Sequence, residues 1–189
     1  MKQEISKMKN SLFKIALEGS DEVSLISDKL QILHGTSARV KRKAAKVLNE
    51  EFDIHPRRDE DYWDQRNRKL YYIVLQSPVD SLIYSPDPGF HVLCAARLEL
   101  TDYNQPKYIV LDFIRTASRA KRQGHAAKVV NFVLEMQKYF ACKIYVCSLP
   151  ATIGYWTRFG FVKAISAQLD DEMNEFMDCC LMVPSKITW

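Results

Sequence analysis

The sequence has no apolar run that approaches the roughly 18 residues a membrane-spanning helix requires. Its first residues also lack the apolar stretch of a secretory signal peptide, so a cytoplasmic protein with no membrane partner is expected. Metal-ligating residues are scarce, because only five cysteines and four histidines are scattered over 189 residues, with no CxxC spacing. The sequence therefore predicts free, reduced thiols and no metal site.

The sequence also lacks a strong excess of positive or negative residues, since its formal net charge is only +4. Basic residues gather in two places, at 39–46 and at 119–122. A nucleic-acid-binding domain usually carries a stronger positive excess with interleaved aromatic residues. No nucleic-acid partner is expected, and the first basic cluster is interpreted as the solvated face of a helix.

The sequence does contain a succession of strand-like and helix-like segments that suits a single α/β domain. Residues 1–20 are expected to form an N-terminal extension or an edge strand, and residues 21–189 the domain. The expected order is strand, helix, helix, three strands, helix, strand, helix and two strands. Its first helix is short and ends at His34 and Gly35, where glycine suits a left-handed cap.

The segment Lys121–Ala126 lies between a predicted strand at 108–114 and a predicted helix at 124–140. Gly124 lets the backbone approach a ligand, and the free amide groups of a first helical turn point outward. The helix dipole and the basic neighbours add positive charge there, so the segment suits a pyrophosphate. Taken alone, the motif leaves open a basic helix start with a packing glycine.

Two motifs together resemble the GNAT superfamily, the general-control-related N-acetyltransferases. The pattern basic-x-x-Gly-x-Gly/Ala at 121–126 is similar to the family's coenzyme A pyrophosphate loop. The segment Ala151–Phe161 is similar to its aromatic-x-x-x-Gly-Phe element. The resemblance covers roughly residues 22–183. It implies a central mixed, mostly antiparallel twisted sheet flanked by helices, and acetyl-CoA as the co-substrate of an N-acetyltransferase.

The resemblance also implies which residues bind acetyl-CoA. Backbone amides at the end of the fourth strand would bind the pantetheine arm, and loop amides would hold the phosphates. Lys121 stands where arginine or glutamine is usual, and His125 is interpreted as a solvent-facing or phosphate-edge residue. The complete set of expected acetyl-CoA-binding residues is Ile114, Arg115, Thr116, Lys121, Arg122, Gln123, Gly124, His125, Ala126 and Ala127.

Three residues are candidates for catalysis. The tyrosine that often protonates the CoA thiolate in this family lies four residues before the glycine, where this chain has Trp156. Because indole cannot supply a proton at neutral pH, Tyr155 is the candidate substitute, with packing in the core as its alternative role. Asp112 is the lone carboxylate of an apolar strand and is expected to be the general base for the amine. An ion pair with Arg97 or Arg115 is the alternative for Asp112.

The acceptor is expected to be a protein N-terminal α-amine. Deprotonating lysine at pH 7 costs about 4.6 kcal/mol, whereas an α-amine costs about 1 kcal/mol. The segments 47–52 and 104–106, together with Asp112, resemble the actin-type N-terminal acetyltransferase branch, which acetylates acidic N-termini. That resemblance implies a basic groove, for which Arg97 and Arg158 are the candidates, with Arg115. A small-molecule amine, an internal lysine and a non-catalytic acetyl-CoA-binding module stay open.

Overall fold

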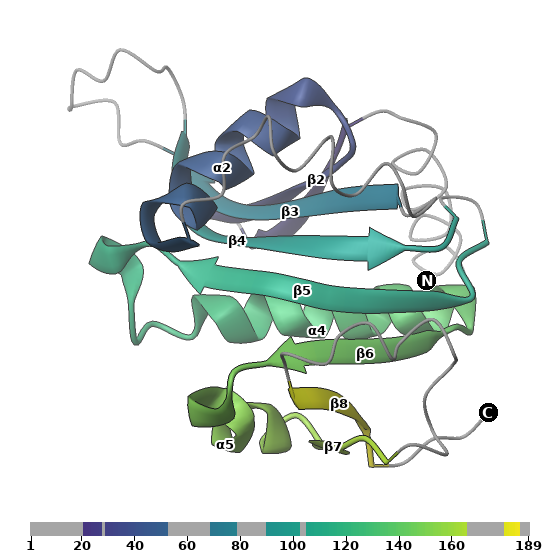
Figure 1. The fold of residues 1–189 in the computed structure, drawn as a ribbon. Coiled ribbons are helices and arrows are strands. Elements are labelled where there is room, and N and C mark those ends of the chain that lie inside the picture. Colours follow the sequence, from purple (N-terminus) through teal and green to yellow (C-terminus); the bar gives the residue numbers. More distant parts are fainter. Residues whose placement is uncertain are drawn as a thin grey trace.

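The computed structural model describes residues 21–27, 29–52, 69–78, 90–102, 105–165 and 180–185. They form an eight-stranded sheet with helices on both faces (Figure 1). The strands are β1 (Asp21–Ser27), β2 (Leu30–Gly35), β3 (Lys69–Pro78), β4 (Phe90–Leu100), β5 (Tyr108–Thr116), β6 (Lys143–Ser148), β7 (Phe161–Lys163) and β8 (Cys180–Pro184). The helices are α2 (Ala38–Phe52), α4 (His125–Phe140) and α5 (Ile153–Thr157), with 3-10 turns η2 (Ser118–Ala120) and η3 (Pro150–Thr152).

The strands are arranged in the order β1-β2-β3-β4-β5-β6-β8-β7. All neighbours are antiparallel except β5 and β6, which are parallel. Helix α4 connects these two strands, since a parallel pair needs a crossover connection. The predicted α/β fold with a mixed, mostly antiparallel sheet is confirmed.

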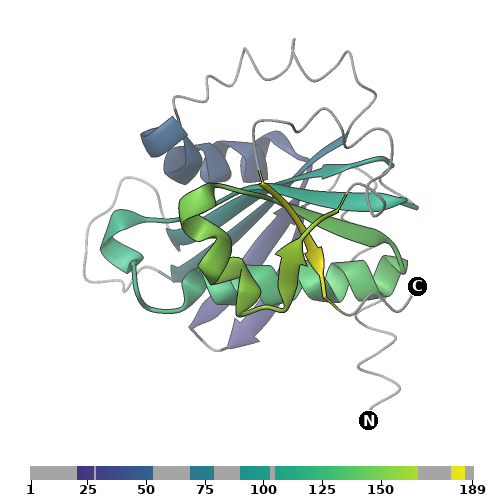
Figure 2. The same ribbon diagram turned by 60° about the horizontal axis from the view of Figure 1, so that its bottom comes forward.

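Helices α2 and α4 cover opposite faces of the sheet (Figure 2). Val129, Val130 and Val133 of α4 belong to the larger core cluster, and Val40 and Ala44 of α2 belong to the second. The strands between them are therefore buried on both faces, which explains their nearly continuous apolar sequences.

Helix α2 begins as the sequence predicts. The Ser37 hydroxyl oxygen accepts hydrogen bonds from the backbone N–H groups of Arg39 (3.2 Å) and Val40 (3.4 Å), so Ser37 is the N-cap. None of the helices in the described ranges is long and apolar enough to cross a bilayer.

One predicted element is wrong. The short helix expected to end at His34 and Gly35 is strand β2, which pairs with both β1 and β3. Ile32 lies in the α4 core and Leu33 in the α2 core, so β2 lacks the alternation typical of a half-exposed strand. The other predicted strands and helices are confirmed where they fall on described residues, with shifted ends. Residues 1–20 lie outside that part of the chain.

Candidate functional site

The parallel strands β5 and β6 separate halfway along their length. Their pairing runs from Tyr108 and Lys143 to Leu111 and Val146. Beyond that point β5 continues to Thr116, while β6 pairs with β8 on its other side. The edge of β5 that faces β6 is therefore not paired with it after Leu111. An unpaired strand edge presents N–H and C=O groups that can bind an extended ligand.

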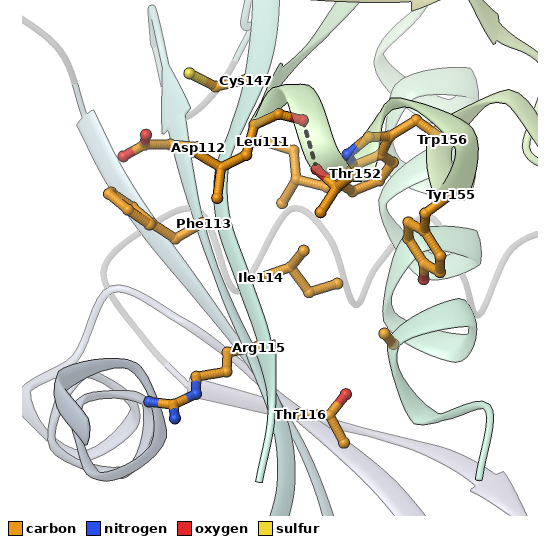
Figure 3. A pocket seen from close by; sticks show the side chains of 12 residues that line it. Leu111, Asp112, Phe113, Ile114, Arg115, Thr116, Cys147, Thr152, Tyr155 and Trp156 are labelled. Atoms are coloured by element: carbon orange, nitrogen blue, oxygen red, sulfur yellow. Dashed lines mark hydrogen bonds between the residues drawn. The ribbon is translucent and has the colours of Figure 1, made fainter. Parts of the chain in front are cut away.

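A cavity of about 370 Å³ fills the space between the separating strands (Figure 3). This volume lies within the range of small-molecule sites. Its walls come from β5, the end of β6, the first turn of α4, and α5 with the turn before it. The lining residues are Leu111, Asp112, Phe113, Ile114, Arg115, Thr116, Ala126, Cys147, Leu149, Thr152, Tyr155 and Trp156. Most of this lining is apolar, with a few polar groups, as is usual for such sites.

The predicted phosphate loop lies at the N-terminus of α4. Gly124 is the N-cap with φ 74° and ψ 13°, in the left-handed region that favours glycine. A Cβ atom placed on Gly124 would meet no atom within 4 Å, so the space above it is open. The first turn of α4 has no acidic residue, and Lys121 and Arg122 are exposed beside it. Free helix amides with nearby cations suit an anion.

Arg122 also has a left-handed backbone, with φ 64°, although it is not glycine. Together, Arg122 and Gly124 turn the loop sharply around the exposed Gln123 before α4 begins. Turns that combine right-handed and left-handed residues direct successive N–H groups into a concavity that binds anions. The loop geometry therefore agrees with the phosphate-binding role expected from the sequence.

His125 does not face solvent as the sequence analysis expected, because it is 8% exposed. Its Nε2 lies 3.1 Å from Oε1 of Gln123, and its buried Nδ1 has no hydrogen-bond partner in the described part of the chain. Burial, with a smaller effect of nearby Lys128, lowers the pKa of His125. Ala126, the next residue, lines the cavity, whereas Ala127 does not.

Asp112 occupies a β-bulge. Arg97 pairs with Phe113 and Leu98 pairs with Leu111, so Asp112 is the additional residue of β5 between them. A bulge leaves an unpaired residue and redirects its side chain, a feature often found near active sites. Neither the bulge nor its position follows from the sequence, which is continuously apolar from Tyr108 to Ile114 apart from Asp112.

The carboxylate of Asp112 is paired with Arg97. Oδ2 of Asp112 accepts hydrogen bonds from Nε of Arg97 at 2.9 Å and from Nη2. The two side chains are only 8% and 3% exposed, so the pair is buried. The guanidinium also lies 4.3 Å from the centroid of the Phe113 ring, a cation–π contact. The ion pair that the sequence analysis gave as the alternative role of Asp112 is therefore present.

The three arginines expected to line a basic groove do not come together. Arg97 is buried against Asp112, and Nη1 of Arg115 donates to the carbonyl of Val47 in α2 at 3.0 Å. Arg158 is exposed at the end of α5 and is not among the residues that line the cavity. Among the described residues, these arginines therefore give no basic groove.

Tyr155 and Trp156 both line the cavity but differ in burial. Trp156 is 4% exposed and packs edge-on against Phe161, with 6.0 Å between ring centroids. Tyr155 is half-buried, and its hydroxyl oxygen is buried without a hydrogen-bond partner in the described residues. Burial, with a smaller effect of Cys94, raises the pKa of Tyr155 to about 12. Trp156 therefore supports the cavity wall, and Tyr155 supplies a polar group to it.

The cysteines differ from expectation at one position. Cys94, Cys142 and Cys180 are free, as predicted, but Cys147 at the cavity is disulfide-bonded, and its partner lies outside the described residues. The sequence did not predict this disulfide, because the spacing of the cysteines around Cys147 is irregular. In the described ranges, no group of three or more His, Cys, Asp or Glu side chains is placed to hold a metal ion.

Leu149 and Thr152, which line the cavity at η3, were not among the predicted site residues. The carbonyl oxygen of Leu149 accepts hydrogen bonds from the hydroxyls of Ser148 (2.9 Å) and Thr152 (3.0 Å) and from the Thr152 backbone N–H (2.9 Å). These bonds fix the turn that follows β6, while the Leu149 side chain is 58% exposed beside the cavity.

Comparison with known proteins gives the fold. No protein-family model matches the sequence, and a search of curated proteins finds no similar sequence. The chain is structurally similar to N-acetylglutamate synthase from Neisseria gonorrhoeae, solved with coenzyme A and L-arginine (TM-score 0.56, 12% identity, 84% of this chain and 33% of that one). It is also similar to an acyl-CoA N-acyltransferase from Pseudomonas aeruginosa (TM-score 0.53, 15% identity, 82% of this chain and 99% of that one). Tetrahymena GCN5 matches with a TM-score of 0.50 and 12% identity, over 90% of this chain and 99% of that one.

These proteins share the arrangement of strands and helices with this chain. Because their sequence identity to it is only 12–15%, the similarity shows a common fold and nothing more. They give no support to a relationship with the actin-type N-terminal acetyltransferases.

Proposed function

Since the chain has the GNAT fold, we propose that it is an acetyl-CoA-dependent N-acetyltransferase that acts on a primary amine. One observation supports this above all: β5 and β6 separate beyond Leu111 and Val146, and the cavity between them reaches the first turn of α4. The part of β5 beyond its pairing with β6, an apolar cavity and a cationic helix N-terminus adjoin one another. They match the amide-containing arm and the pyrophosphate of one extended ligand.

The dimensions agree with this placement. The pantetheine arm has about 13 bonds between phosphorus and sulfur and spans about 16 Å when extended. The five residue steps from Thr116 to Leu111 also span about 16 Å along a strand. With its phosphates at Gly124, the arm would follow Thr116, Arg115 and Ile114 and bring the thioester to Asp112. The structurally similar N-acetylglutamate synthase was itself solved with coenzyme A.

The reaction needs little from the protein beyond positioning. The amine nitrogen attacks the thioester carbonyl carbon, the C–S bond breaks, the sulfur keeps the electron pair, and the amine loses a proton. A thiolate whose parent thiol has a pKa near ~8.5 leaves without an acid catalyst. Among the described residues that line the cavity, Asp112 supplies the carboxylate. Its carboxylate, oriented by the hydrogen bond from Arg97 to Oδ2, would accept the amine proton, directly or through water.

The acceptor that suits this site best is a protein N-terminal α-amine. A carboxylate already bonded to a guanidinium suits an amine that is partly neutral near pH 7. Removing the proton costs about 1 kcal/mol for an α-amine and about 4.6 kcal/mol for lysine. An acidic N-terminus, as in the actin-type branch, is the narrower form of this proposal. A small-molecule amine and an internal lysine are the alternative acceptors.

A second candidate is supported by the same residues. Oδ2 of Asp112 is bonded to Arg97, and a buried Trp156 stands where the family's tyrosine acid is expected. A chain with this site could bind acetyl-CoA without transferring the acetyl group. Such a module would bind acetyl-CoA and leave every acceptor unmodified.

The test is an acetyl-transfer assay with purified protein and acetyl-CoA. Peptides with varied first residues, the same peptides with a blocked N-terminus and an internal lysine, and simple amines serve as acceptors. Acetylation of free N-termini with no modification of blocked peptides supports the proposal. Modification of only lysines or small amines shifts the acceptor class, and acetyl-CoA binding without any transfer supports the second candidate.

A further inference from the structure

The Tyr155 hydroxyl is a buried polar group for which the described chain provides no hydrogen-bond partner. Buried polar groups are nearly always paired, and leaving one unpaired is unfavourable. Its ring is held edge-on to Trp156 (5.1 Å between centroids) and tilted against Phe159 (5.2 Å). The hydroxyl is therefore fixed in the cavity by packing of the ring.

This hydroxyl lies toward the outer half of the cleft. Figure 3 shows it directed along β5 toward Thr116 and away from Asp112. Burial raises the pKa of Tyr155, and Cys94 adds a smaller effect. Cys94 pairs with Thr116 across β4 and β5, and its sulfur accepts a hydrogen bond from the Thr116 hydroxyl at 3.7 Å. The surroundings of the Tyr155 hydroxyl thus belong to the phosphate-loop end of β5.

The reacting sulfur belongs at the other end. An arm of about 16 Å that begins beside Thr116 would place the sulfur near Leu111 and Asp112. The polar groups between the phosphate and the sulfur are one hydroxyl and two amides, and the amide carbonyl oxygens accept hydrogen bonds. A phenol hydroxyl directed toward Thr116 faces the part of the arm that carries these groups.

We propose that Tyr155 binds acetyl-CoA by donating a hydrogen bond from its hydroxyl to an amide carbonyl of the pantetheine arm, and that it does not protonate the departing sulfur. The inference rests on the proposed acetyl-CoA site and assigns one residue within it. It replaces the acid role that the sequence suggested for Tyr155. The pKa of Tyr155, raised by burial, agrees with a group that donates a hydrogen bond and keeps its proton.

The experiment compares Tyr155→Phe with wild type by calorimetry, using three probes. They are CoA, desulfo-CoA (in which hydrogen replaces the thiol) and adenosine 3′,5′-bisphosphate, the nucleotide half of CoA. Phenylalanine keeps the ring that packs against Trp156 and Phe159 and removes only the hydroxyl. Tyr139→Phe, at a 37% exposed tyrosine of α4, is the matched control.

The inference predicts that Tyr155→Phe weakens CoA and desulfo-CoA by the same factor, about five- to tenfold. The nucleotide half should bind unchanged, and Tyr139→Phe should match wild type with all three probes. A loss seen with CoA but absent with desulfo-CoA would place the hydroxyl at the sulfur and overturn the inference. Unchanged affinity for both would overturn it as well.

Failure of the proposed function gives a different result. If the wild-type protein bound neither CoA nor desulfo-CoA, the acetyl-CoA site itself would be wrong, whatever the variant does. A pH–rate profile adds a second readout. Tyr155→Phe should raise the KM for acetyl-CoA while the shape of the kcat profile stays the same. Loss of a high-pH limb in kcat would instead identify Tyr155 as the acid.

Discussion

Arg97 and Asp112 form a buried ion pair across β4 and β5, at the residue where β5 bulges. The bulge places Asp112 and Phe113 on the same stretch of strand opposite Arg97, so the guanidinium contacts both the carboxylate and the ring. The pair has two possible consequences for activity. It either orients a general base or only holds the two strands together.

The first prediction separates these roles with Asp112→Asn, which preserves side-chain size. If Asp112 is the base, the variant should turn over about 10²-fold more slowly than wild type. This loss should shrink at high pH, where more of the amine is already neutral. Acetyl-CoA affinity should stay within about twofold. The measurement is a pH–rate profile of wild type and variant side by side.

Arg97→Gln is the matched control, because it breaks the same pair from the other side. Each variant leaves a buried partner uncompensated and should lower the free energy of unfolding by about 3 kcal/mol. If Asp112 serves only the ion pair, both variants will lose the same fraction of activity at every pH. Parallel pH profiles for wild type and Asp112→Asn would thus contradict the base role.

The second prediction concerns acid stability through His34 of β2. Its ring is fully buried, shares a 2.5 Å hydrogen bond with the Tyr71 hydroxyl of β3, lies 3.4 Å from the Ser24 hydroxyl of β1, and contacts Phe132 of α4. Burial lowers the pKa of His34 to about 4. Burial, with smaller effects of the Glu22 and Asp21 carboxylates of β1, raises the pKa of Tyr71, the hydrogen-bond partner of His34.

Because the folded-state pKa of His34 lies below the unfolded value of about 6.5, protons favour the unfolded chain. The contribution of neutral His34 to the free energy of unfolding is complete above pH 6.5. As the pH falls toward 4, this contribution should be lost, which lowers the free energy of unfolding by about 3 kcal/mol in total. Urea denaturation between pH 7 and pH 4 measures it. In His34→Asn, the free energy of unfolding should depend less on pH in this range. Tyr71→Phe should lower the free energy of unfolding at pH 7 but keep its dependence on pH. An unchanged slope in His34→Asn would refute this account.

The third prediction concerns the C-terminus of α4. Ala141 caps the helix with φ 49° and ψ 37°, in the left-handed region, and its N–H donates to the carbonyl of Gln137. Glycine adopts this conformation without the steric cost that alanine has there. Ala141→Gly should therefore raise the free energy of unfolding by about 0.5–1 kcal/mol, measured by thermal denaturation. Asn131→Gly, in the exposed interior of the same helix, should give no gain.

The sequence predicted those parts of the site that are local in the chain. The loop before α4 combines a glycine, a helix start and cations within six consecutive residues, so the pattern at 121–126 predicted its backbone directly. The cap at Ser37 and the helix that follows were predictable for the same reason. Each of these features depends on neighbours a few positions apart.

The parts that could not be predicted depend on contacts between distant segments. The bulge at Asp112 exists only in the pairing register of β4 and β5, and the apolar run of β5 does not reveal it. Arg115 was expected to face the acceptor but is used to bind the Val47 carbonyl, 68 positions away in the chain. Strand β2 was mistaken for a helix because burial on both faces removed its period of two.

The central claim, an acetyl-CoA site at the N-terminus of α4, is tested most directly by calorimetric titration of acetyl-CoA into wild type, Gly124→Glu and Gly160→Glu. Both glycines have left-handed backbones, with φ 74° and φ 79°, so both variants carry the same kind of strain. Only Gly124→Glu would put bulk and negative charge beside the phosphates. We expect it to weaken binding at least tenfold, about 1.4 kcal/mol, while folded Gly160→Glu keeps wild-type affinity. Wild-type protein without affinity for acetyl-CoA, or a folded Gly124→Glu variant that binds as well as wild type, would contradict the account.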